Sequence, residues 1–376
     1  MNIICVLNHP AHYYLFKNII SQLRKNSHHV DILIKEKDIL EDLLNSEKQE
    51  FKKICFRIRR SKNIFSIFFS SIIELIIQNF NLYVYILKKK KNPDALIGTD
   101  ISITHIGKLF SIPSFVFNED DFEINKLFCK TSYPFATAIV SPDYTSVGKY
   151  IHKKISYNGI QKMAYLHEDY FKPDPSILKK LSISKTEKFF IIRLVSLTSG
   201  HDIEGKHSGI SLIMIKKLIS FLENYGKVFI TSESTIDSEF SNYIVNIMPN
   251  EMHSLMYYSS FFIGDSQTMC AEAGILGVPF IRFNDFVGKI NYLNDIENNY
   301  KLGWGVKTSN PEKVFDILDD HFKSKNYKEI WKTNVKRLFN DKIDLNSLTV
   351  WLIENYPNSI ASLKSDKISI DKFKFK

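Results

Sequence analysis

Short, uninterrupted apolar runs that each end in a polar loop constrain the fold of this chain most strongly. The first run is residues 3–7, after which the loop Asn8-His9-Pro10-Ala11-His12 precedes apolar residues at helical spacing up to Leu23. A run of this kind is typical of a parallel strand that is buried on both faces. Because parallel strands need helix-length crossovers, the alternation predicts a doubly wound α/β fold.

The pattern recurs in both halves of the chain. Further strands are predicted at residues 30–34, 95–97, 114–117, 138–140, 189–195, 227–231, 261–264 and 279–283, with a helix at 210–224. Between the halves, Asn158-Gly159 is a turn signal, and Lys172-Pro173-Asp174-Pro175 cannot continue a helix or a central strand.

A chain of 376 residues is also too long for one ordinary core. We therefore predict two Rossmann-like domains, each doubly wound, with parallel sheets that face each other across a cleft. The predicted parts are an N-terminal domain at 1–160, a linker at 161–178, a C-terminal domain at 179–345, and a helix with a basic tail at 346–376.

The composition is that of an ordinary soluble protein, with 44% hydrophobic and 24% charged residues. Four scattered cysteines without a CxxC pair favour reduced structural thiols, and the first residues read as a strand and not as a signal peptide. We therefore expect a cytoplasmic protein. The net charge of +9 indicates either an ordinary basic surface or attraction to anionic lipids or a phosphorylated substrate.

The segment Ile64–Leu87 is strongly apolar and is flanked by basic residues. Its polar residues Glu74, Gln78, Asn79 and Asn81 make it a poor membrane span. Two interpretations stay open: one or two core helices of the N-terminal domain, or a helix whose apolar and basic face rests on the inner face of the cell membrane.

The most informative segment is residues 264–279. After a predicted strand, Asp265 or Ser266 can cap a helix over residues 267–276, and Gly277 ends that helix. A helix that begins at the carboxyl end of a parallel strand presents N–H groups and the positive end of its dipole, which suits a diphosphate.

Two further side chains of this helix fit a nucleotide. Thr268 adds a hydroxyl beside that of Ser266. Glu272 lies roughly 9 Å along the helix axis from Ser266, which suits a carboxylate that binds ribose hydroxyls. The alternative is a capped core helix with an exposed glutamate.

The segment 264–279, with the sequence GDSQTMCAEAGILGVP, resembles the donor-site segment of GT-B proteins. These include UDP-N-acetylglucosamine 2-epimerases and glycosyltransferases of the MurG and lipid-A-disaccharide synthase type. Residues 1–320 resemble a narrower group, the DUF354 family. The stretches that carry this resemblance are LNHPAH at 7–12, FKN at 16–18, FNED at 117–120, YNGI at 157–160, AYLH at 164–167, YFKPD at 170–174, GKVFI at 226–230, MH at 252–253 and RFN at 282–284.

The resemblance also implies roles for individual residues. In MurG-like glycosyltransferases, a histidine in the loop after the first strand is the general base for the acceptor hydroxyl, which would be His12 or His9 here. The alternative for each histidine is a hydrogen bond that fixes the loop. Gln267-Thr268 stands where 2-epimerases carry consecutive glycines, and this departure weakens an epimerase interpretation.

A cluster of three carboxylates, Glu119, Asp120 and Asp121, follows a predicted strand. It could bind acceptor hydroxyls, hold a metal, or act as acid and base, because neighbouring carboxylates push their titrations apart. The alternative is a solvated acidic loop, and Asp100 is a weaker candidate of the same kind. GT-B enzymes generally stabilise the leaving diphosphate with a helix dipole and cations, so we predict no metal and no cofactor.

Several positions in the second half complete the candidate site. Arg193 ends a predicted strand and could neutralise the leaving diphosphate. His253 could contact the uracil or the sugar, or cap a helix. The spacing of His201, Asp202 and His207 matches no common metal site, so we interpret them as substrate-loop or surface residues. The residues expected to bind the nucleotide-sugar are Arg193, His253, Asp265, Ser266, Gln267, Thr268, Glu272 and Asn284.

These features predict a metal-independent glycosyltransferase of GT-B fold. Its donor would be a UDP-linked sugar, N-acetylated or not, and its acceptor a glycan or glycolipid in the synthesis of a surface polysaccharide or glycolipid. No nucleic-acid partner is expected. Two alternatives stay open: a UDP-N-acetylhexosamine 2-epimerase or nucleotide-sugar hydrolase, and a non-catalytic nucleotide-sugar-binding protein.

Overall fold

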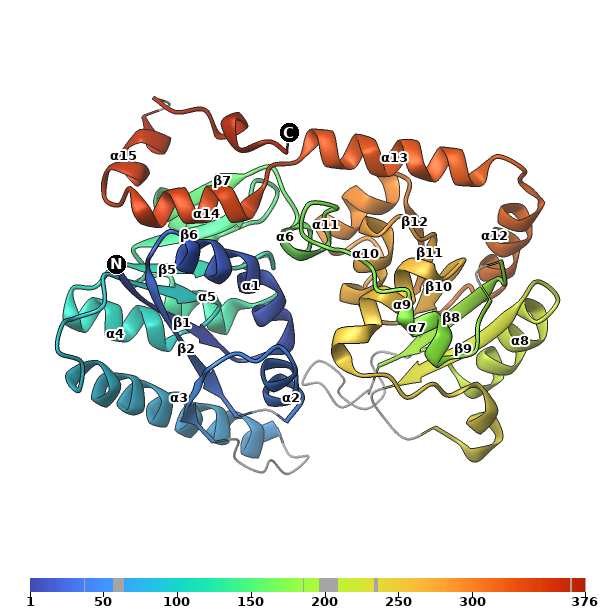
Figure 1. Cartoon of the computed structure of the whole chain (residues 1–376), viewed down its shortest axis with the longest axis horizontal. Helices are drawn as coiled ribbons and strands as arrows, with labels where there is room; N and C mark the ends of the chain where they lie inside the picture. Colours follow the sequence, from blue (N-terminus) through green and yellow to red (C-terminus); the bar gives the residue numbers. More distant parts are fainter. Residues whose placement is uncertain are drawn as a thin grey trace. The chain divides into compact units, whose positions relative to one another are not determined.

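The computed structural model describes residues 1–36, 38–56, 64–184, 186–195, 209–232, 236–365 and 367–375. The chain forms two compact units (Figure 1). The N-terminal unit combines Met1–Tyr165 with Lys342–Lys376, and the C-terminal unit is Leu166–Asp341. The C-terminal residues therefore complete the first unit, although they follow the second unit in the sequence.

The N-terminal unit is built on a seven-stranded parallel sheet with the order β3-β2-β1-β4-β5-β6-β7. The chain adds strands outward from β1 first on one side (β2, β3) and then on the other (β4 to β7), and this reversal of strand order is typical of a doubly wound fold. The strands are β1 (Asn2–Leu7), β2 (His29–Lys35), β3 (Lys52–Cys55), β4 (Ala95–Gly98), β5 (Ser114–Phe117), β6 (Ala138–Pro142) and β7 (Lys154–Tyr157).

Helices cover both faces of this sheet, with α1 and α14 on one face and α3 and α4 on the other (Figure 1). The packing of α14 against α1 explains why the end of the chain belongs to this unit. The helices are α1 (Pro10–Lys25), α2 (Asp38–Ser46), α3 (Ile64–Leu87), α4 (Ser102–Phe110), α5 (Lys126–Ser132), η1 (Gly148–Lys153), α6 (Met163–Leu166), α14 (Leu345–Glu354), α15 (Asn358–Lys364) and η5 (Ile370–Phe373).

The C-terminal unit has a five-stranded parallel sheet with the order β12-β11-β10-β8-β9. Its strands are β8 (Phe189–Leu194), β9 (Lys227–Ser232), β10 (Phe261–Gly264), β11 (Phe280–Phe283) and β12 (Gly303–Val306). Its helices are α7 (Ser176–Lys180), α8 (Leu212–Leu222), η2 (Ser238–Tyr243), η3 (Pro249–Glu251), α9 (Met252–Tyr258), α10 (Gln267–Ile275), α11 (Asn291–Asn294), η4 (Asp295–Asn299), α12 (Glu312–Lys323) and α13 (Tyr327–Asp341).

The predicted α/β fold with two parallel sheets is confirmed. Each strand that the apolar runs predict is present, within one or two residues at its ends. The sequence did not predict β3, β7 and β12, which lie at sheet edges. The segment Ile64–Leu87 forms a single helix, α3, where one or two were expected. All four cysteines are buried free thiols.

Candidate functional site

In the C-terminal unit, α10 begins directly after the carboxyl end of β10. Ser266 is its N-cap, and the Ser266 hydroxyl accepts a hydrogen bond from the Met269 amide at 3.3 Å. Gly277 follows the helix with a φ of 80°, a conformation that glycine adopts at little cost and that closes a helix end. Residues 265–269 are partly exposed, whereas residues 270–276 are buried. The N-terminal turn is therefore the part of α10 that a ligand can reach, and its N–H groups and dipole favour an anion.

Gly264, the last residue of β10, has an arginine beside it in each neighbouring strand. Its register partners are Arg193 in β8 and Arg282 in β11. A Cβ at position 264 would lie 3.1 Å from the Arg193 carbonyl oxygen, so a larger residue would push β8 away. The lack of a side chain at Gly264 avoids this close contact with β8.

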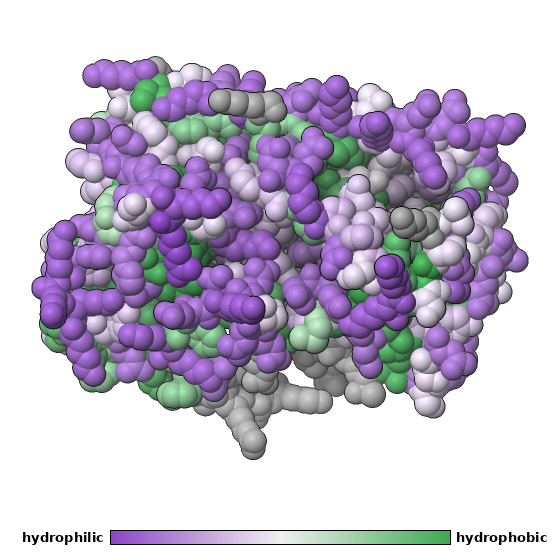
Figure 2. Space-filling model, viewed as in Figure 1, coloured by the Kyte–Doolittle hydropathy of each residue, from purple (hydrophilic) through white to green (hydrophobic). Residues whose placement is uncertain are grey.

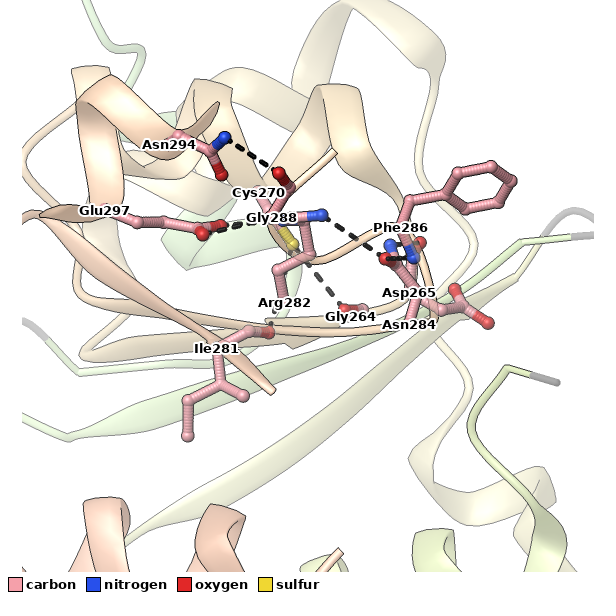
Figure 3. Close-up of polar contacts among 10 residues, drawn as sticks. All are labelled: Gly264, Asp265, Cys270, Ile281, Arg282, Asn284, Phe286, Gly288, Asn294 and Glu297. Carbon is pink, nitrogen blue, oxygen red and sulfur yellow. Dashed lines mark hydrogen bonds and ion pairs between the residues drawn. The ribbon is translucent and has the colours of Figure 1, made fainter. Parts of the chain in front are cut away.

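Arg282 has a side chain that is fully buried, yet it carries a charge. Its Nε and one terminal nitrogen donate to the two carboxylate oxygens of Glu297, at 2.7 and 2.9 Å. The other terminal nitrogen donates to Oδ1 of Asn284 at 3.3 Å (Figure 3). A two-point ion pair of this geometry is what a buried guanidinium needs to offset its lost hydration.

Asn284 extends this network to the start of α10. Its Nδ2 donates to the main-chain oxygen of Asp265 at 3.0 Å, and its Oδ1 also accepts from the Phe286 amide at 3.0 Å (Figure 3). Glu297, Arg282 and Asn284 thus hold the residue that precedes the helix cap. Asn284 was predicted to bind the nucleotide-sugar; the contacts assign it a positioning function, and direct binding stays a prediction.

Asp265 turns its carboxylate toward the main chain at the end of β8. Its Oδ1 accepts from the Val195 amide at 2.9 Å, and the Ile210 amide also donates to this carboxylate. A Cβ on Gly209 would lie 2.3 Å from Oδ2, so this close approach requires a glycine. Burial raises the pKa of Asp265 to about 6. The hydrogen bonds and the nearby charge of Arg193 lower this pKa, but their effect is smaller than that of burial.

Glu272 is buried, not exposed, and faces α9. One of its carboxylate oxygens lies 3.4 Å from Nε2 of His253, whose side chain is also buried. The structure thus brings together two residues that were predicted as nucleotide-sugar ligands on separate grounds. Their proposed contacts with ribose and with the base or sugar stay predictions.

In the N-terminal unit, both candidate histidines lie where β1 leads into α1. His9 is the N-cap of α1, and its Nδ1 accepts from the Ala11 amide at 3.1 Å. Nδ1 of His12 lies 3.3 Å from the Asn8 amide and 2.6 Å from the Thr99 hydroxyl. A main-chain N–H can only donate, so Nδ1 of each ring carries no proton.

This assignment fixes what the other ring nitrogen can do. A neutral imidazole with an unprotonated Nδ1 carries its proton on Nε2, which makes Nε2 a donor. Both rings therefore fit hydrogen-bond donation to a ligand better than the predicted removal of a proton. The general-base role stays a prediction that kinetics must test.

Asp100 follows β4 and is buried in a hydrogen-bonded cluster. Its carboxylate accepts from Asn8 at 2.5 Å, from Gln78 at 2.9 Å, and from the amide of Ser102 at 2.7 Å; the Ser102 hydroxyl also donates to it. With four donors in place, this carboxylate is suited to holding the β1 and β4 loops together.

The three carboxylates that follow β5 lie in different environments. Glu119 forms a buried ion pair with Lys162 and accepts from the Gln161 amide at 3.1 Å. Asp121 accepts from the Ser146 amide at 2.7 Å, whereas Asp120 is exposed. No group of three His, Cys, Asp or Glu side chains could hold a metal ion among the residues that the structure describes, and His201, Asp202 and His207 lie outside them.

The model of the DUF354 family, described as a protein of unknown function, matches residues 2–297. The chain belongs to this family. No curated protein matches the sequence of this DUF354 chain.

Solved structures similar to this DUF354 protein include UDP-GlcNAc 2-epimerases and glycosyltransferases. The UDP co-structure of MnaA from S. aureus is 13% identical, covers 96% of this chain and 98% of its own, and has a TM-score of 0.64. UDP-GlcNAc 2-epimerase from Neisseria meningitidis, bound to UDP-GlcNAc, is 12% identical and has a TM-score of 0.60; the match covers 88% of this chain and 94% of the epimerase chain. MurG from Acinetobacter baumannii is 13% identical and has a TM-score of 0.56; the match covers 94% of this chain and 99% of the MurG chain. These similarities confirm the GT-B-like fold.

Sequence reasoning missed Glu297 and Lys162, and it noted Arg282 only as part of a family motif. One signal was present for Arg282: a lone charge inside the apolar strand FIRF must find a buried partner. The partner could not be identified, because Glu297 lies in an irregular helical segment with no pattern of its own.

Proposed function

We propose that this DUF354 protein is a glycosyltransferase that takes a UDP-linked sugar as its donor. The observation that carries the proposal is the reachable N-terminal turn of α10 at the end of β10, in a fold whose solved neighbours include proteins bound to UDP and UDP-GlcNAc. The diphosphate would accept hydrogen bonds from the first N–H groups of α10 and from the Thr268 hydroxyl. Gln267 and Ser266 would complete this set of donors.

In the transfer step, an acceptor hydroxyl oxygen bonds to the anomeric carbon while the bond from that carbon to the diphosphate breaks. The acceptor proton leaves to a base, and UDP departs with an added negative charge. Donors fixed before the reaction stabilise that charge without reorganisation. The network of Glu297, Arg282 and Asn284 supports this role, because it fixes the residue before the α10 cap.

The acceptor would be a glycan or glycolipid used to build a surface polysaccharide or glycolipid. On the acceptor side, His12 would donate Nε2–H to a substrate oxygen, and the exposed carboxylate of Asp120 is the candidate base. Both residues follow strands whose carboxyl ends meet at one edge of the N-terminal sheet. This leaves His9 in a capping role.

A UDP-N-acetylhexosamine 2-epimerase is the second candidate, because one solved neighbour is such an enzyme with its substrate bound. That reaction needs carboxylates that exchange protons with the sugar. Two of the carboxylates that could serve, Asp100 and Glu119, are held by several donors or by a buried ion pair, which favours the transferase.

One experiment separates the candidates. The pure full-length chain is incubated with a panel of UDP-sugars, with and without glycan or lipid-linked acceptors, and sugar and nucleotide are followed by proton and phosphorus NMR. Release of UDP that depends on an acceptor supports the transferase. An epimerised sugar on intact UDP supports the epimerase and contradicts the transferase. Tight binding without turnover supports a non-catalytic binding protein.

A further inference from the structure

Helix α3 exposes an apolar stripe on the surface of the N-terminal unit. Ile76 is 62% exposed and Phe80 is 64% exposed, and exposed apolar side chains are informative where they gather on one face. The spacing of the exposed residues confines them to about 100° of the helix surface, which is one face. The exposed apolar residues of α3 are Phe69, Ile72, Ile73, Ile76, Phe80 and Leu87.

The opposite side of α3 is packed into the unit. Buried residues recur every four positions at Ser70, Glu74, Gln78, Leu82 and Ile86. The polar members of this row have specific contacts: Glu74 forms a 2.5 Å ion pair with Lys35, and Gln78 donates to Asp100 at 2.9 Å.

These contacts decide how α3 can meet a membrane. By length and composition alone, Phe69–Leu87 could cross one. A span would expose Glu74 and Gln78 to hydrocarbon and break their bonds, at a cost of several kcal/mol for each unsatisfied group. The helix can therefore present one apolar face while it stays packed against the sheet.

Positive charge borders this stripe. Between Phe69 and Leu87 the charged side chain is Glu74, which is buried, so the stripe itself carries no charge. Exposed lysines follow at the end of the helix: Lys88, Lys90 and Lys91, the last of which also pairs with Asp94 at 3.4 Å.

The neighbouring helix α4 also combines exposed apolar and basic residues. The rings of Tyr83 and Phe110 lie 5.4 Å apart, which places the end of α4 beside α3. The adjacent residues Lys108 and Leu109 are exposed, and α4 contains no acidic residue. In Figure 2, hydrophobic and hydrophilic residues alternate along the lower left edge, where Figure 1 places α3 and α4.

We propose that this surface docks on an anionic lipid bilayer. We call it the α3 face and define it as the six apolar residues of α3 with Lys88, Lys90, Lys91, Lys108 and Leu109. The apolar side chains would enter the boundary between headgroups and acyl chains, and the lysines would meet anionic headgroups. Charge complementarity favours the bilayer over a second copy as the occupant, because the α3 face of a second copy has no acidic side chain to pair with these lysines.

Binding to lipid requires no donor and no turnover, so this docking is independent of the proposed function. If both hold, the enzyme acts where lipid-linked acceptors are found. The two fail separately: the chain could bind vesicles without any transferase activity, or transfer sugar without binding vesicles.

The test is co-sedimentation of the full-length chain with vesicles of phosphatidylcholine alone or mixed with phosphatidylglycerol. We expect binding to the mixed vesicles that weakens as salt rises. The double variant Ile76→Glu, Phe80→Glu and the triple variant Lys88→Glu, Lys90→Glu, Lys91→Glu should each bind about tenfold less or weaker still.

A matched control places the same charges on another exposed apolar pair. Leu212 and Ile213 at the start of α8 are also exposed, and Leu212→Glu, Ile213→Glu should leave vesicle binding unchanged. Circular dichroism melting verifies that each variant folds. The proposal is overturned if the wild-type chain does not bind mixed vesicles, or if Ile76→Glu, Phe80→Glu binds them normally. It is also overturned if sedimentation velocity without lipid shows a dimer that this variant dissociates.

Discussion

Arg282 and Glu297 form a two-point ion pair inside the C-terminal unit, with nitrogen–oxygen distances of 2.7 and 2.9 Å. Neither side chain has appreciable contact with solvent. Through Asn284, the pair reaches the main chain of Asp265, one residue before the cap of α10. The pair therefore links the stability of this unit to the geometry of the proposed donor site.

Removing one charge of this pair should destabilise the protein strongly. Glu297→Gln keeps the shape of the side chain but leaves a buried guanidinium without its counter-charge, at an expected cost of about 3–5 kcal/mol in the free energy of unfolding. Glu312→Gln is the matched control, because it breaks an exposed pair with Lys217 and should cost about 0–1 kcal/mol. Urea unfolding measures both, and equal effects of the two variants would contradict a structural role for the buried pair.

The raised pKa of Asp265 predicts a specific pH dependence of stability. Its pKa of about 6 in the folded chain lies above its ordinary value of 3.8, so the folded state binds the proton more tightly. The contribution of Asp265 to the free energy of unfolding is then fully present below pH 3.8 and is lost as the pH rises through about 6. Asp265→Asn cannot titrate, so the stability difference between wild type and variant should change across this range. Parallel stability curves from pH 4 to pH 6 would show that burial does not perturb Asp265.

Substitutions at His12 should distinguish a hydrogen-bond donor from a base. The Nδ1 contact with the Asn8 amide leaves the proton on Nε2. His12→Gln places an amide N–H near the Nε2 position and should retain far more kcat than His12→Ala, with little change in KM for the donor. The alternative result has two parts: both substitutions inactivate the enzyme equally, and one ionisation disappears from the pH profile of kcat/KM. That result would identify His12 as the base.

Glu272 should affect the recognition of ribose. If its carboxylate binds ribose hydroxyls, Glu272→Gln should reduce the preference for UDP over 2′-deoxyuridine diphosphate. The variant lacks the charged acceptor that distinguishes the two ligands by the 2′-hydroxyl. We expect roughly tenfold weaker UDP binding, in the range for a hydrogen bond to a charged group. Glu329→Gln on α13, outside this site, is the control. An unchanged preference in calorimetry would assign Glu272 solely to its pair with His253.

The sequence predicts most of the fold because most strands are buried on both faces. Continuous apolar runs reveal those strands, and their alternation with helix-length segments predicts parallel sheets. The unpredicted strands β3, β7 and β12 read KKIC, KISY and GWGV. As edge strands they need no continuous apolar run, so periodicity does not reveal them.

The candidate site is less predictable from sequence than the fold. The cap at Ser266 follows from local chemistry and lies where it was expected. The interactions of Asp265, Asn284 and Glu119 could not be predicted, because their partners Val195, Asp265 and Lys162 are distant in sequence. Local pattern shows which residue types are present, whereas pairing of buried polar groups depends on tertiary packing.

Calorimetric titration of UDP into wild type and Thr268→Glu tests the central claim most directly. A glutamate at the second position of a helix is favourable for the helix itself, because it complements the dipole, but it would repel a bound diphosphate. We predict that Thr268→Glu folds normally and binds UDP at least about tenfold more weakly. Ile213→Glu places the same charge at the second position of α8 in the same unit and should bind UDP like wild type. Normal UDP binding by Thr268→Glu would contradict a nucleotide site at the start of α10.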